Sequence, residues 1–168
     1  MRHFILPALT LLFLTMLSLT SCAFKAPSAV AVLKPAPGNT AAGTVSFAQQ
    51  GKSVLIKGRF TGLAPGAHGF NIHERGDCAS PGGHFNPFGK RHGDLSRPDH
   101  HAGDLPMLVA GAAGQAHFEA LMNGLSLEDG QANILGRSIV VHAKPDDFTT
   151  QPTGNSGPGV ACGVIKAQ

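Results

Sequence analysis

Histidines and one aspartate in the middle and later parts of the chain carry the chemistry of this sequence. The 168 residues include nine His, and the candidates in chain order are His73, His84, His92, His100, His101, Asp104 and, much later, His142. Imidazole suits zinc and copper, and three imidazoles with one carboxylate make a closed tetrahedral zinc site. A single His in such a position is more often a surface or hydrogen-bonded residue. Five in one loop with an Asp at matched spacing favour a metal site.

Two kinds of placement are visible among these residues. His92, His101 and Asp104 lie close enough in one segment to surround a single ion. His142 ends the apolar run Ser138–His142 and would project from a rigid strand, as a second site requires. The spacing therefore predicts one site in a loop and a second beside a strand.

The composition excludes other classes of protein. Charged residues make up 14% of the chain, against about 25% in an ordinary soluble domain, which argues against a disordered polyelectrolyte. The net charge is +3, and no run of Lys and Arg interleaved with aromatic residues occurs, so no nucleic-acid partner is expected. The length suits one domain.

The elements that must position the site are short strands. Ser53–Phe60 alternates, with Val54, Ile56 and Phe60 on one face and Lys57 and Arg59 on the other, which is typical of a half-buried strand. A turn around Gly51 joins it to Thr44–Ala48 as a hairpin. No window shows a helical apolar stripe, and the polar stretch from His73 to Leu105 predicts a long functional loop. Further strands are predicted at Ala29–Lys34, Ala67–His73, Met107–Ala110, Ala116–Leu121, Ser138–Ala143 and Gly159–Ile165, which together indicate an antiparallel sandwich or barrel.

The N-terminus is typical of an export signal. Arg2 precedes an uncharged apolar stretch that is short for a membrane span, and the segment ends Leu19-Thr20-Ser21-Cys22. It resembles a bacterial lipoprotein signal, which implies a signal peptide over 1–21, lipidation of Cys22, a tether over 22–28 and a domain over 29–168. The expected location is the bacterial cell envelope, periplasmic and lipid-anchored to a membrane. The alternative is a plain secretory signal with a chance Cys.

Two cysteines remain in the exported chain. In an oxidising compartment, Cys78 and Cys162 favour one disulfide over two separate thiols.

Several motifs in register resemble the copper-zinc superoxide dismutase family, and the resemblance spans Ala29 to Ile165. The sequence is also similar to dismutase-like bacterial lipoproteins that lack a copper ligand. The resemblance implies an all-β, eight-stranded Greek-key barrel of the Ig-like sandwich class and an enzyme that converts superoxide to oxygen and hydrogen peroxide. The motifs are Gly62-Leu63, Gly66–Phe70, His84–Pro87, His101–Leu105, Gly136–His142, Gly154–Gly157 and Ala161–Ile165.

The resemblance assigns roles residue by residue. It implies that His68 is structural and that Asp146 links the two metal sites from behind the ligands, as such carboxylates do. It leaves His100 and His117 without a role, and it places Cys78 and Cys162 on the intrachain disulfide of the family. The implied zinc ligands are His84, His92, His101 and Asp104, and the implied copper ligands are His73, His84 and His142, with His84 bridging the metals.

Two positions depart from the family pattern. The fourth copper His is expected two residues before His73, where the chain has Asn71. An amide oxygen is a weaker ligand for copper than an imidazole nitrogen. The Arg that attracts superoxide is expected three residues before Cys162, where the chain has Gly159. Losing that focused charge predicts that the on-rate for an anion falls by about 10-fold or more.

Three hypotheses follow. The first is a working dismutase that uses copper and zinc, with superoxide as its substrate and Asn71 or water completing the copper shell. The second is a zinc-stabilised protein of weak or no activity that binds copper ions for storage, delivery or sensing. The third is a structural envelope domain in which zinc is only a staple. Because function belongs to the site, the fold does not choose among them.

Overall fold

The computed structural model describes residues 26–168. The predicted signal peptide, Cys22 and most of the predicted tether lie outside the described residues. The domain predicted to begin at residue 29 begins its first strand one residue earlier, at Ser28. Within residues 26–168, no helix is long and apolar enough to cross a membrane.

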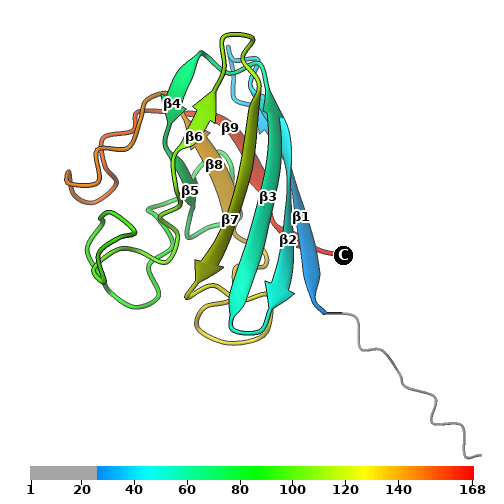
Figure 1. Cartoon of the computed structure of the whole chain (residues 1–168), viewed down its shortest axis with the longest axis vertical. Helices are drawn as coiled ribbons and strands as arrows, with labels where there is room; N and C mark the ends of the chain where they lie inside the picture. The colour runs from blue at the N-terminus through cyan, green and yellow to red at the C-terminus, as the bar shows by residue number, and fades with distance from the viewer. Residues whose placement is uncertain (1–25) are drawn as a thin grey trace, which may run out of the picture.

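All the regular elements of the described chain are strands, and they pair antiparallel into a curled sheet (Figure 1). The larger sheet runs β5-β8-β9-β1-β2-β3-β7, with β10 also paired to β1, and β4 and β6 form a separate pair. This confirms the predicted all-β barrel class. The strands are β1 (Ser28–Pro35), β2 (Ala42–Gln50), β3 (Ser53–Thr61), β4 (Gly66–His68), β5 (Phe70–Ile72), β6 (Leu108–Ala110), β7 (Ala116–Asn123), β8 (Ser138–His142), β9 (Gly159–Val164) and β10 (Lys166–Ala167).

The predicted alternation of β3 is present. Val54, Ile56 and Phe60 are buried while Lys57 and Arg59 are exposed, because successive residues of a strand face opposite sides of the sheet. The hairpin with β2 closes through Gly51, whose φ is +58°. A glycine adopts that left-handed conformation without a steric penalty.

The strand count differs from the predicted eight because the run Ala67–His73 is two strands. β4 pairs with β6 while β5 pairs with β8, so the chain changes partner at Gly69. A Cβ at Gly69 would lie 2.7 Å from the Cβ of Ser156, so only glycine lets the loop before β9 approach this closely. The two-residue strand β10 is too short to leave a pattern in the sequence.

The core fixes the orientation of β5. Phe70 packs edge-to-face against Phe60 and Phe118, with ring centroids 5.4 and 4.9 Å apart, and such pairs each add about 0.5–1.5 kcal/mol beyond simple burial. With Phe70 and Ile72 in the core, the alternation of side chains places Asn71 and His73 on the opposite face. That face is also buried, because loops cover it.

Two loops form this cover on one side of the barrel. Figure 1 shows the long loop between β5 and β6 (green) and the loop between β8 and β9 (orange) on the same side of the molecule. The first is the predicted polar stretch from His73 to Leu105. It is tied to the sheet by the disulfide between Cys78 and Cys162, which confirms the predicted pairing.

Candidate metal centre

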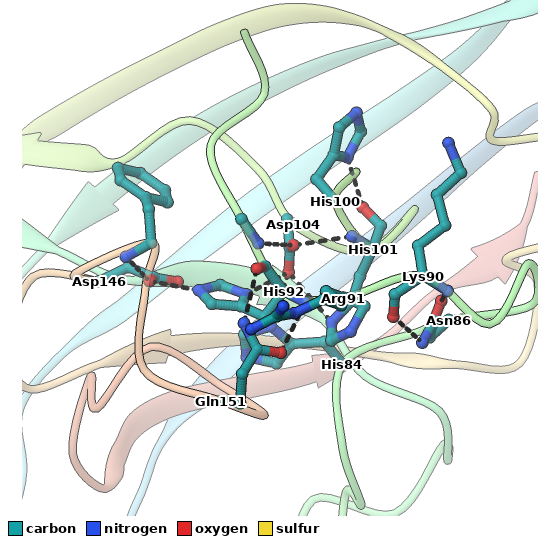
Figure 2. Close-up of polar contacts among 12 residues, drawn as sticks. His84, Asn86, Lys90, Arg91, His92, His100, His101, Asp104, Asp146 and Gln151 are labelled. Carbon is teal, nitrogen blue, oxygen red and sulfur yellow. Dashed lines mark hydrogen bonds and ion pairs between the residues drawn. The ribbon is translucent and has the colours of Figure 1, made fainter. Parts of the chain in front are cut away.

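Asp104 is the centre of the first group of candidate ligands, and it is fully buried. Its Oδ1 lies 2.8 Å from Nδ1 of His84, 3.1 Å from Nδ1 of His92 and 3.5 Å from Nδ1 of His101. Figure 2 shows these side chains converging. The backbone N–H groups of His101 and Gly93 donate to Oδ2 at 2.9 and 3.3 Å, which fixes the carboxylate. The structure thus brings together the four residues predicted for zinc, and their ligand atoms lie within 4.8 Å of one another.

Electrostatic interactions within this group shift the pKa values of Asp104 and His92. Burial alone would raise the pKa of Asp104, but contacts with His101, His84 and His92 outweigh it and hold that pKa well below its usual range. Burial would lower the pKa of His92, but Asp104 and Asp146 on its two sides raise it to about 9. The buried carboxylate of Asp104 therefore stays ionised beside a positive charge, which is the proton on His92 in the metal-free protein and would be a metal ion in the loaded one.

The loop between β8 and β9 contacts His92 on the side of the ring opposite Asp104. Asp146 Oδ1 lies 2.7 Å from Nε2 of His92 and accepts a 2.9 Å bond from the N–H of Phe148. Gln151 clamps the backbone of His92, accepting from its N–H at 3.0 Å and donating to its C=O at 2.8 Å, as Figure 2 shows. Asp146 thus contacts the first group through His92, while its Oδ2 is buried without a protein partner.

The second group consists of His73, His84 and His142, all buried and with ligand atoms within 4.8 Å of one another. Nδ1 of His73 lies 2.9 Å from the carbonyl of Gly82, and Nδ1 of His142 lies 2.9 Å from the carbonyl of Gly157. A carbonyl only accepts, so Nδ1 carries the proton in each neutral ring and Nε2 carries a lone pair. Burial lowers the pKa of His73 to about 3 and also lowers that of His142, which keeps both rings neutral and ready for a metal.

His84 belongs to both groups. Its Nδ1 faces Asp104 in the first group, and its Nε2 is buried without a protein partner. Nδ1 of His101 is likewise buried without a hydrogen-bond partner. Unpaired buried nitrogens are costly, so their concentration here fits metal ions as the missing partners. The donor set fits zinc in the first group and copper or zinc in the second.

Asn71 occupies the position predicted to lack a copper ligand. It is 1% exposed, and neither its Oδ1 nor its Nδ2 has a hydrogen-bond partner in the protein. Gly159, the second departure, pairs directly with His142 at a bulge between β8 and β9. No side chain extends from Gly159 beside the second group, where the family pattern places a cation.

The remaining histidines lie outside both groups. His68 is buried, and its Nδ1 and Nε2 lie 2.7 and 2.8 Å from the carbonyl oxygens of His142 and Ala64, a structural placement in keeping with its expected role. His100 contacts the carbonyl of His101, and His117 is exposed on β7. Of these two neighbours, His101 lies in the first group and His100 does not, which agrees with the ligand set that the resemblance implies.

Two residues at the site, Gln151 and Phe148, were not predicted from the sequence. Gln151 clamps His92 across 59 residues, and nothing local in the sequence marks such a contact. Phe148 stacks on the His92 ring, with centroids 6.4 Å apart and an interplanar angle of 20°. Its φ of +55° is unusual for an aromatic residue. The adjacent pair Asp146-Asp147 could have indicated a turn around Phe148, because Asp side chains accept hydrogen bonds from the backbone of turns.

Comparisons with known proteins agree with this geometry. The sequence pattern of the family described as copper/zinc superoxide dismutase (SODC) matches residues 41–165. The extracellular superoxide dismutase [Cu-Zn] of Brugia pahangi is 43% identical over 154 residues, covering 84% of this chain and 76% of that protein. Superoxide dismutase [Cu-Zn] of Onchocerca volvulus is 42% identical over 153 residues, covering 82% and 94%. Superoxide dismutase [Cu-Zn] 2 of Mesembryanthemum crystallinum is 44% identical over 151 residues, covering 83% and 95%.

The fold has a close counterpart among solved structures. The crystal structure of the clock protein EA4 superposes with a TM-score of 0.77 at 38% identity, covering 85% of this chain and 96% of that one. The barrel, the two adjoining ligand groups, the disulfide and these matches agree, and the chain belongs to the copper/zinc superoxide dismutase family.

Proposed function

We propose that this protein is an exported dismutase-family enzyme that disproportionates superoxide at a zinc and copper centre, more slowly than a centre with a full copper ligand set. The observation that carries the proposal is His84, whose two ring nitrogens face two separate groups of candidate ligands. Zinc is assigned to His84, His92, His101 and Asp104, and copper to His73, His84 and His142.

The chemistry divides between metal and protein. Bound copper supplies the one-electron steps, in which two superoxide ions and two protons become one oxygen and one hydrogen peroxide. Because Nδ1 of His84 faces Asp104 of the first group, Nε2 is the atom of this ring that would hold and release a proton. Asp104 and Asp146 fix the orientation of the ligand rings, and the carbonyls of Gly82 and Gly157 select the Nδ1–H tautomers of His73 and His142.

Two features support a lowered rate. Asn71 offers a weaker donor than imidazole at the copper group, and Gly159 leaves the site without the positive charge that would attract an anion. Between Lys144 and Lys166 the chain has no Lys or Arg to replace it.

The N-terminal sequence supports a location. We infer that residues 1–21 are removed, that Cys22 is lipidated, and that the tether holds the domain at a membrane of a bacterial envelope, with the periplasm as its compartment.

A second function is favoured by the same Asn71. If copper is held but does not turn over, the protein is a zinc-stabilised copper carrier, store or sensor. The zinc group is complete in either case.

Activity and metal content separate these functions. Purified protein loaded with both metals is expected to consume superoxide, and Asn71→His is expected to raise the rate about 10-fold or more, since it restores an imidazole donor. Asn123→His, which adds a His at an exposed position on β7, is the matched control and should leave the rate unchanged. An inactive parent beside a strongly active Asn71→His variant would overturn the dismutase function. Zinc without measurable copper binding would overturn both functions and leave a structural role.

A further inference from the structure

His73 and His142 face each other through nitrogens that both lack a proton. Their Nε2 atoms lie 3.2 Å apart, while each Nδ1–H donates to a backbone carbonyl at 2.9 Å. Two neutral rings of this tautomer have no proton to share between the facing nitrogens. The pair therefore presents two converging lone pairs, a ready-made site for a cation that binds two imidazoles.

His84 adds a third nitrogen to this pair. Its Nε2 is buried without a protein partner, and its ligand atom lies within 4.8 Å of those of His73 and His142. The opposite nitrogen faces the carboxylate of Asp104, so His84 is shared with the first group. Two imidazoles belong to the second group alone.

Asn71 of β5 and His73, the residue directly after β5, lie on the same face, since one residue separates them along the extended chain. Its amide is 1% exposed and lacks partners at both polar atoms. An amide oxygen is a hard, neutral donor and cannot replace the σ-donation of an imidazole nitrogen to copper. The second group thus has three nitrogens and no fourth.

The two oxidation states of copper respond differently to that loss. Cu(II) favours a tetragonal set of four nitrogen or oxygen donors. Cu(I) is a d¹⁰ ion, and such an ion has no geometric preference from its d-electrons, so two or three imidazoles satisfy it. Replacing the fourth imidazole by an amide weakens Cu(II) binding much more than Cu(I) binding.

From these contacts we propose that the second group selects Cu(I) over Cu(II), with Asn71 as the residue that sets this preference. The inference rests on the proposed assignment of copper to this group, but it does not require turnover of superoxide.

Competition measurements on the zinc-loaded, disulfide-intact protein test the proposal. Under anaerobic conditions, Cu(I) is competed against bathocuproine disulfonate, and Cu(II) is competed separately against nitrilotriacetate. In the parent, the Kd for Cu(I) is expected to lie below the Kd for Cu(II). Asn71→His is expected to tighten Cu(II) by about 100-fold or more and Cu(I) by less than about 10-fold. Asn123→His is the control for an added imidazole and should change neither Kd.

Three results would contradict a preference of the second group for Cu(I). Equal tightening of both ions in Asn71→His, or a parent that binds Cu(II) more tightly than Cu(I), overturns the proposal. Zinc that fills the second group and resists displacement by Cu(I) also overturns it. Should Asn71→His fail to fold, the order of the two Kd values in the parent decides alone. A parent that lacks activity but prefers Cu(I) defeats only the dismutase function, and an active parent that prefers Cu(II) defeats only this inference.

Discussion

His92 lies between two carboxylates, and this position governs how the first group takes up a metal. Nδ1 is 3.1 Å from Asp104 and Nε2 is 2.7 Å from Asp146. These carboxylates overcome the opposing effect of burial and raise the pKa of His92 to about 9 in the metal-free protein. Metals bind neutral imidazole, so this proton must leave before His92 can act as a ligand.

Zinc binding is therefore expected to release about one proton from His92 at pH 7.5 and almost none from it at pH 10. Calorimetry in buffers of different ionisation enthalpy measures this number. Asp146→Asn should lower the pH at which the release falls away, because it removes one of the two charges. The same proton release at pH 7.5 and pH 10 would contradict the prediction.

The folded metal-free protein follows the opposite trend with pH. A raised pKa means that protonated His92 contributes stability that is complete below the unfolded value of 6.5 and is lost as pH rises through about 9. High pH thus favours zinc binding while it weakens the metal-free fold.

At this scale the sequence predicted which candidate ligands lie together, and it did not predict the residues that support them. His84, His92, His101 and Asp104 lie within 20 residues of one another, so their spacing reveals them. The contact of Gln151 with His92 spans 59 residues, and it arises only when the loop before β9 folds over the loop after β5.

In the loop between β8 and β9, Gly154 packs so closely against the site that there is no room for a side chain at this position. Its φ is +67°, and a Cβ there would overlap Oδ1 of Asp146 and lie 2.6 Å from Nε2 of His92. The hydrogen bond between Asp146 and His92 therefore depends on a glycine at this position.

Gly154→Ala is expected to displace Asp146 and to weaken zinc binding by about 10- to 100-fold, the usual loss when a residue supporting a ligand is removed. Gly157→Ala is the matched control. It has a similar φ of +76°, and its Cβ would come no closer than 3.6 Å to a neighbour. Chelator competition for zinc measures both variants, and equal losses in the two would show that backbone strain alone is responsible.

The strands themselves were predictable where one face is buried. β3 alternates because it separates core from solvent, whereas β8 is buried at all five positions and was predicted from its unbroken apolar run instead. The break at Gly69 depends on a close approach by Ser156, which is 87 positions further along the chain, so local pattern could not reveal it.

The whole molecule joins a compact barrel to an N-terminal segment that differs in composition. The barrel accounts for residues from Ser28 onward, and Cys22 lies outside the described residues. The proposed order of signal peptide, tether and domain is a prediction from the sequence.

Replacing the proposed lipidation site tests this organisation. The parent is expected in the membrane fraction and the Cys22→Ser variant in the soluble fraction, because a lipid chain binds bilayers through its buried methylenes. Ser21→Ala keeps a small residue before the cysteine and should behave as the parent. Detergent phase partition measures the difference, and a parent that partitions into water would contradict the anchor.

One ring that serves two groups has a thermodynamic consequence. His84 offers Nδ1 to the first group and Nε2 to the second, so an ion at either nitrogen alters the electron density at the other. By the reciprocity of coupled equilibria, the factor by which zinc changes the affinity for copper equals the factor by which copper changes the affinity for zinc. With zinc and copper bound as proposed, the protein has no single zinc affinity: its affinity for zinc takes one value when the copper site is empty and another when it is filled.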